Sequence, residues 1–388
     1  MSVTTKKYLP EKYTVAARIM IGAGLVIWIA GYLFDAQRAA FANLITFLFA
    51  ASIAGGSLFL VALEYIGGAV WSVPMRRVNE FLAGMVPLVP LFAAPLFLNL
   101  HTLFQWTHLD AVQADVLLQA KEPYLNVTFF AIRFAVIFLL WMVFYYMFIK
   151  NSIQQDINKD QKLTTANIRL AAGFIPVFAI TLSVLAIDWG MSLEPHWYST
   201  IYAVYFFSGT IVASIAAGTL VILKFHDLGL LPTLRRDHFY SLGALLFAFV
   251  NFWAYIAFSQ FLLMWYANLP EEVFWFIKRW NNGWEYASIA LIILQFAVPY
   301  GVLLSQDAKM DPKRLRFIAV WILVAHFVDV FWLVMPTYSA SFTIGWMEIG
   351  FPILLIGVVL LLLIVKVTRY NTVPIGDPKL QRGLDFRL

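Results

Sequence analysis

Long runs of apolar residues recur along the chain and are separated by short polar segments. A helix needs about 20 mostly apolar residues to cross the hydrocarbon core of a bilayer. The runs are continuous rather than alternating, which predicts helices and not the strands of a membrane barrel. Ten stretches qualify as spans, at about residues 14–34, 41–69, 80–100, 125–149, 168–189, 198–223, 240–267, 282–305, 315–335 and 343–366.

These runs predict an all-α integral membrane protein that forms a single membrane domain over residues 1–388. The composition agrees, because 62% of the residues are hydrophobic and only 13% are charged. A soluble domain has about 45–50% apolar and about 25% charged residues. A soluble, disordered or collagen-like chain is therefore excluded. The first apolar run is longer than the core of a signal peptide and lacks an obvious cleavage site, so we expect a retained helix.

Lys and Arg residues are distributed unequally between the two ends of the predicted spans. Of the 27, 22 lie in the two terminal segments, in the loops after the second, fourth, sixth and eighth spans, or at the span ends that adjoin them. Four lie in the opposite loops, and Arg133 lies inside a span. The positive-inside rule then predicts that residues 1–13 and 367–388 are cytoplasmic tails. The net charge of +5 is thus explained by membrane flanks, and no nucleic-acid partner is expected.

Two motifs recur in the same order, four spans apart. The second span contains ASIAGGSL and the sixth contains ASIAAGTL, while Asp188 and Asp329 are each followed seven residues later by Pro. An offset of four spans preserves orientation, so the repeat is parallel. It predicts one four-helix bundle over residues 41–189 (helices 2–5), a second over 198–335 (helices 6–9), and peripheral helices 1 and 10. The small residues of the motifs predict close helix packing.

Several ionisable side chains lie inside the predicted spans, where an unpaired charge is costly and a partner or a wet cavity is usual. His326 and Asp329 are three residues apart and therefore share a helix face. Glu64 is the one clear acid in the cytoplasmic half. These groups predict a proton route or a quinone-associated site, or alternatively structural ion pairs. The candidate proton-route residues are His326, Asp329, Glu64, Asp188, Glu348 and Glu285.

Arg133 lies about 12 Å inside its helix and needs an acid. Asp188 belongs to the same predicted bundle and is the expected partner, in a pair that could be purely structural. The chain has no Cys, so it cannot supply thiolate ligands to a metal or an iron–sulfur cluster. Only His326 lies well inside a span, which argues against bis-histidine haem ligation. We therefore expect no cofactor and no metal in this chain.

Two segments resemble a known family. The run DWGMSLEPHWYSTIYAVYFFSG begins at Asp188 and includes His196, and the segment KEPYLNVTFFAIR ends at Arg133. Both are similar to the ten-helix members of the NrfD/polysulfide-reductase family of membrane subunits. The resemblance is strongest to the second such subunit of alternative complex III, and it covers essentially all spans. Asp188, His196 and Arg133 are the positions that match the motifs of the family.

The resemblance implies a cofactor-free subunit of a respiratory quinol oxidoreductase in the bacterial inner membrane. This subunit would contribute scaffold and proton-conducting or quinone-associated groups, with quinone as a candidate ligand. The implied partners are a related NrfD-like membrane subunit with the better-established quinol site, extracytoplasmic iron–sulfur and haem c subunits, and, as a further candidate, a terminal oxidase. The alternative is a stand-alone secondary transporter coupled to protons, although such transporters favour inverted repeats and sites at the midplane.

Overall fold

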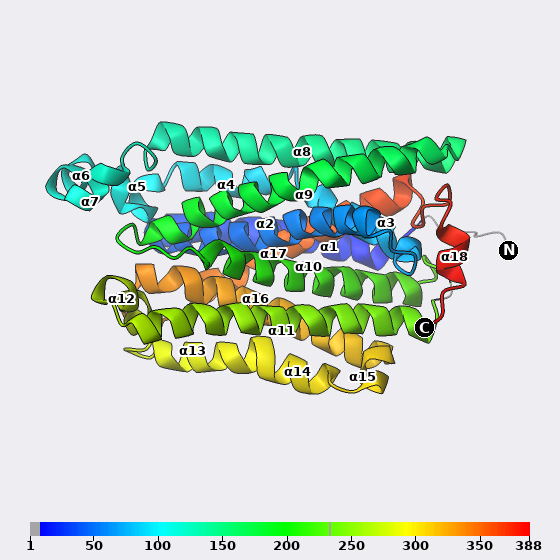
Figure 1. The fold of residues 1–388 in the computed structure, drawn as a ribbon. Coiled ribbons are helices and arrows are strands. Elements are labelled where there is room, and N and C mark those ends of the chain that lie inside the picture. The colour runs from blue at the N-terminus through cyan, green and yellow to red at the C-terminus, as the bar shows by residue number, and fades with distance from the viewer. Residues whose placement is uncertain (1–7, 233) are drawn as a thin grey trace.

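The computed structural model describes residues 8–232 and 234–388, and the regular secondary structure in these ranges is helical. Ten segments of the described chain are long and apolar enough to cross a membrane, which confirms the predicted spans. Figure 1 shows them side by side along one direction. Most spans are single helices: α1 (Glu11–Phe34), α2 (Ala36–Gly67), α8 (Val127–Asn158), α9 (Gln161–Trp189), α10 (Tyr202–Asp227), α11 (Arg236–Ala267), α16 (Pro312–Tyr338) and α17 (Trp346–Arg369).

Two spans are built from shorter pieces. The third combines η1 (Val73–Met75), α3 (Arg76–Leu82), η2 (Ala83–Met85) and α4 (Val89–Phe97). The eighth combines α13 (Trp284–Ile292), the π-helical turn η5 (Ile293–Ala297) and α14 (Val298–Leu303). The third span begins at residue 73 and not near residue 80, because its first turns carry charged side chains that are buried by pairing.

Short helices cover the ends of the spans. They are α5 (Leu100–Leu103), η3 (Gln105–Thr107), α6 (Leu109–Ala114), α7 (Val116–Lys121), η4 (Met191–Leu193), α12 (Pro270–Lys278), α15 (Gln306–Met310) and α18 (Leu380–Leu384). Helix α12 carries Glu271 and Glu272 in its first turn and buries Trp275. We call the end that carries α5–α7 and α12 the distal face, and the end where α1 begins and residues 370–388 lie the terminal face (Figure 1).

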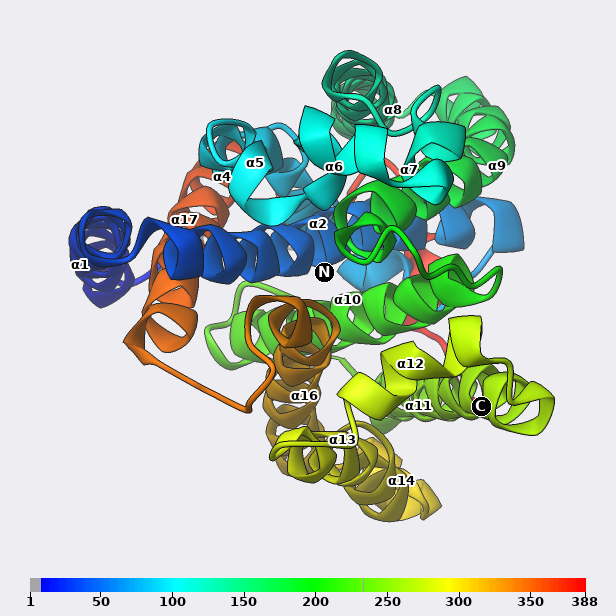
Figure 2. The same cartoon turned by 90° about the vertical axis from the view of Figure 1, so that its left-hand side faces the viewer.

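The two copies of the repeated motif face each other at the centre of the molecule. Helix α2 packs against α3, α4, α9 and α10, and α10 in turn packs against α11 and α16 (Figure 2). A Cβ added to Gly56 would lie 2.1 Å from the Ser214 Oγ. The Ser214 hydroxyl donates to the Ser52 carbonyl at 3.1 Å. The small residues therefore let the backbones of α2 and α10 approach closely, as the motif predicts. Helix α1 packs mainly on α17, at the edge of the molecule.

Candidate functional site

The structure brings Arg133 and Asp188 together, near the distal ends of α8 and α9. The Arg133 Nε lies 2.7 Å from Asp188 Oδ2, and its Nη2 lies 3.0 Å from Asp188 Oδ1. The third guanidinium nitrogen donates to the Tyr124 carbonyl at 2.8 Å, and the guanidinium stacks on the Tyr124 ring. A buried bidentate pair with every nitrogen bonded is complete without a ligand. This geometry supports the structural interpretation of the pair.

Aromatic rings fill the space next to this pair. The Trp189 indole packs against the rings of Phe47, Phe97 and Phe130, at centroid distances of 4.9, 5.6 and 4.8 Å. Trp189 is 1% exposed. The distal half between α2, α4, α8 and α9 is thus closely packed.

His326 and Asp329 lie on one face of α16, as their spacing predicts, and both are buried. The Tyr205 hydroxyl of α10 donates to Asp329 Oδ1, and the Trp253 Nε1 of α11 donates to Asp329 Oδ2 at 3.1 Å. The His326 Nδ1 lies 4.0 Å from Asp329 Oδ2. Gly209 of α10 permits this close approach, because an added Cβ would lie 3.0 Å from the His326 ring.

The imidazole of His326 is one of the buried polar groups that lack a hydrogen bond. Neither of its ring nitrogens has a hydrogen-bond partner among the residues that the structure describes. The ring of Phe49 covers it, with the ring centroids 5.6 Å apart. An unsatisfied buried polar group costs about 1–3 kcal/mol and calls for an explanation beyond packing.

A cavity of about 650 Å³ adjoins this cluster, between α11, α12, α13 and α16. Tyr205 and Trp253, the two donors to Asp329, form part of its wall. The remaining wall is mostly aromatic and includes no Asp, Glu, Lys, Arg or His among the described residues. Tyr255 and Phe258 of α11 stand at the wall and are 66% and 60% exposed. The cavity therefore opens beside α11, at the side of the group of helices.

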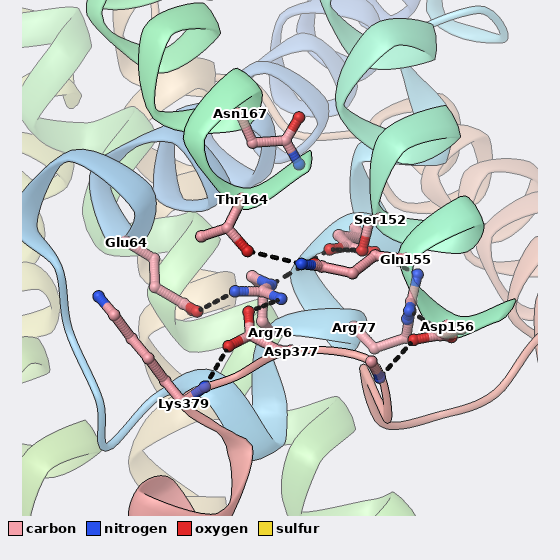
Figure 3. Close-up of polar contacts among 12 residues, drawn as sticks. Glu64, Arg76, Arg77, Ser152, Gln155, Asp156, Thr164, Asn167, Asp377 and Lys379 are labelled. Atoms are coloured by element: carbon pink, nitrogen blue, oxygen red, sulfur yellow. Dashed lines mark hydrogen bonds and ion pairs between the residues drawn. The ribbon is translucent and has the colours of Figure 1, made fainter. Parts of the chain in front are cut away.

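At the terminal face, five buried charged residues and the partly buried Asp156 form a connected network, shown in part in Figure 3. We call it the terminal ionic cluster; its members are Glu64, Arg76, Arg77, Glu80, Asp156 and Asp377. The Arg76 Nη1 lies 3.1 Å from Glu64 Oε1, and its Nη2 lies 2.6 Å from Asp377 Oδ2. The expectation that Glu64 is a lone acid is therefore wrong, because the side chain of Arg76 reaches it from the next span.

The second arginine of the cluster links α3 to α8. The Arg77 Nη1 lies 2.8 Å from Glu80 Oε2, and its Nη2 lies 2.7 Å from Asp156 Oδ2. Glu80 also approaches Arg76, at 3.4 Å from the Nε, and accepts a hydrogen bond from the Ser152 hydroxyl at 2.8 Å. Four carboxyl groups thus share two guanidinium groups. The pairing explains why the charges can be buried.

The other candidate acids have local partners near helix ends. Glu285 accepts from the Gly283 N–H at 2.8 Å, at the beginning of α13. Glu348 accepts from the Arg38 Nε at 2.8 Å and from the Gly345 N–H at 2.7 Å, at the beginning of α17. A carboxylate in the first turn of a helix satisfies free backbone N–H groups. These contacts give both residues a structural role.

His196 lies in the loop between α9 and α10, away from Arg133 and Asp188. Its Nε2 contacts the Asp115 carboxylate at the beginning of α7. This hydrogen bond lowers the pKa of Asp115, because it stabilises the charged carboxylate. The motif position His196 therefore ties the α6–α7 segment to the α9–α10 loop.

One buried cation was not singled out from the sequence. Arg279 follows α12 and is 0% exposed. Its nitrogens donate to the carbonyls of Trp275, Trp332 and Leu333 at 3.0, 3.2 and 2.8 Å, and it stacks on the Trp275 ring at 3.5 Å. Burial lowers the pKa of Arg279 to about 9, so it is still protonated at pH 7. Arg279 locks α12 onto the distal end of α16.

Sequence reasoning also missed most of the terminal ionic cluster. The spacing of Arg76, Arg77 and Glu80 carries a usable signal, because residues three and four apart face each other on a helix. Asp377 carries none, since its partner Arg76 is 301 residues away. Tyr205 and Trp253 likewise reach Asp329 from other helices.

The described residues contain no group of three or more His, Cys, Asp or Glu side chains placed to hold a metal ion. No family model matches the chain, and no curated protein sequence is significantly similar to it.

Proposed function

We propose that this chain is a cofactor-free membrane subunit of a respiratory quinol:electron acceptor oxidoreductase, of the ActF type found in alternative complex III. The motif resemblance around Asp188 and Arg133 and the ten apolar spans support the proposal. Electrons would pass through iron–sulfur and haem c centres held by partner subunits. This chain would contribute scaffold and groups that bind quinone or move protons.

The proposal includes the arrangement of two four-helix bundles. The first comprises α2, α3–α4, α8 and α9, and the second comprises α10, α11, α13–α14 and α16. Contacts of α2 with α9 and α4, and of α10 with α11 and α16, support this grouping. Helix α2 packs directly on α10 through the repeated motif, which supports two bundles that run in parallel and meet at these helices. Helices α1 and α17 would be peripheral.

The observation that carries the proposal is the group of Tyr205, Asp329 and His326 beside the cavity between α11, α12, α13 and α16. A quinone has a neutral ring and an apolar tail, and it reaches its sites from within the bilayer. An uncharged aromatic wall suits such a ring, and Gln260 places a buried, unbonded Oε1 in the same wall. Oxidation of a quinol releases protons together with electrons. Tyr205, Asp329 and His326 form a sequence of groups that could carry such protons away from the cavity.

The orientation in the membrane is also part of the proposal. The uneven distribution of Lys and Arg supports a terminal face in the cytoplasm of a bacterial cell. The distal face would then meet the extracytoplasmic partners. Leu109, Val116 and Leu117, on α6 and α7, are 73%, 78% and 56% exposed, beyond the end of the α8 span. Exposed apolar side chains outside the bilayer support a protein contact there.

Replacing Asp329 with Asn is expected to slow quinol-dependent turnover by about tenfold or more, with the subunit still assembled. Asn keeps the shape and can accept one of the two hydrogen bonds from Tyr205 and Trp253, but it cannot take up a proton. The measurement is electron transfer together with proton release in reconstituted vesicles. The control is Asp307→Asn, the same change at an exposed position of α15. Wild-type turnover and proton release in Asp329→Asn would contradict the role of this cluster.

A further inference from the structure

The C-terminal segment of residues 370–388 folds back across the terminal face, and we call it the C-terminal strap (Figure 1). Although it lies outside the spans, parts of it are packed like core. Thr372 and Val373 are 1% and 0% exposed. The Thr372 hydroxyl donates to the Leu230 carbonyl, in the loop that follows α10. The strap is thus held on the side of the second group of helices.

Two glycines fix the strap at close range. A Cβ added to Gly376 would lie 1.8 Å from the Gln155 carbonyl oxygen, and one added to Gly383 would lie 2.7 Å from the Val70 carbonyl oxygen. These approaches leave no room for a larger residue. The ring of His238, on α11, lies with its Nε2 2.9 Å from the Gly383 carbonyl oxygen. The strap therefore touches the ends of several spans at once.

The strap also contributes one residue to the terminal ionic cluster. Asp377 belongs to it, and the Gly376 N–H donates to Asp156 Oδ1 at 3.2 Å. Lys379 donates to the Gly68 carbonyl at 3.1 Å, at the end of α2. The strap crosses the cluster on its outward side, and the side chains of Arg77 and Glu80 behind it are both 1% exposed. Four carboxyl groups around two guanidinium groups would be strongly hydrated if water reached them.

We propose that the C-terminal strap is a plug that closes the terminal ionic cluster against water, and that its release opens an aqueous path to Glu64 and Glu80. The strap is short and lies outside the spans, so we expect it to open at a lower free energy than the helices beneath it, even though Thr372 and Val373 are buried. The inference rests on contacts at the terminal face and is independent of the proposed oxidoreductase function.

The absence of Cys from the sequence makes a direct test possible, because one introduced thiol is then the only one. Ser152→Cys places the thiol inside the cluster, at a position that is 1% exposed. Cys is close to Ser in shape, so the change is small. Ser305→Cys, in the exposed loop before α15, is the reactive control, and Ser208→Cys, 0% exposed in α10, is the folding control. Each is treated in sealed vesicles with a membrane-impermeant methanethiosulfonate, from one side and then from the other.

In the full chain we expect Ser152→Cys to be unreactive from both sides, while Ser305→Cys reacts from one side. Either a chain ending at Tyr370 or the point change Asp377→Ala should raise the labelling rate of Ser152→Cys by about tenfold or more, as expected for loss of a charged hydrogen bond. Labelling should come only from the side on which Ser305→Cys reacts. Ser208→Cys should stay unreactive.

Two results would overturn the proposal that the strap is a plug. One is labelling of Ser152→Cys in the full chain as fast as Ser305→Cys. The other is an unchanged rate once the strap is removed or loosened. If truncation also exposes Ser208→Cys, the helices themselves have opened. The labelling rate of Ser152→Cys in the Asp377→Ala chain then decides whether the strap is a plug.

Discussion

Replacing Arg76 with Met is expected to lower the free energy of unfolding by about 3–5 kcal/mol. Arg76 is 2% exposed and lies between Glu64, Glu80 and Asp377, which lose their common counter-charge together. Met keeps most of the side-chain volume, so the loss comes from uncompensated buried carboxylates and not from a cavity. Reversible unfolding of the purified chain in mixed micelles measures the effect.

The matched control is Arg169→Met, the same change at an exposed position of α9. Surface substitutions of this kind usually change stability by less than about 0.5 kcal/mol. Adding Glu64→Gln to Arg76→Met should recover part of the loss, because one of the unpaired acids becomes neutral. A loss for Arg76→Met no larger than that of Arg169→Met would mean that the cluster does not stabilise the fold.

Removing Arg133 should have an effect of similar size, about 3–5 kcal/mol, because Asp188 is left charged and buried. Arg133→Leu should therefore damage stability and membrane assembly more than the double change of Arg133→Leu with Asp188→Leu. The four unfolding free energies form a double-mutant cycle, which isolates the coupling between the two side chains. Equal losses for the single and double variants would show that the bidentate contact contributes nothing.

The spans of the fold were predictable because a bilayer imposes a length and a polarity on each crossing. The start of the third span was not. Arg76 and Arg77 interrupt the apolar pattern, yet both are buried, since acids from α2, α8 and the C-terminal strap pair with them. A hydropathy profile includes the cost of burying a charge. It does not show which distant side chain pairs with that charge and offsets the cost.

Side chains that share a helix were also easier to predict than those that meet across helices. The three-residue spacing of His326 and Asp329 places both on one face of α16. Tyr205, a partner of Asp329, comes from α10, and the adjoining cavity depends on how α11, α12, α13 and α16 pack. Arg133 and Asp188 are an intermediate case, because a buried Arg requires an acid and the repeat narrows the choice to one bundle.

Native gel electrophoresis of solubilised membranes, stained for haem and probed for this chain, tests the central claim most directly. If the chain is a subunit of a quinol oxidoreductase, it should migrate with haem c and with a related membrane subunit, far above its own mass of 44.2 kDa. A chain that lacks residues 109–121, which form α6 and α7, should lose the haem c stain while it remains in the membrane. Migration of the full chain without haem c or any partner would contradict the account and favour a stand-alone transporter.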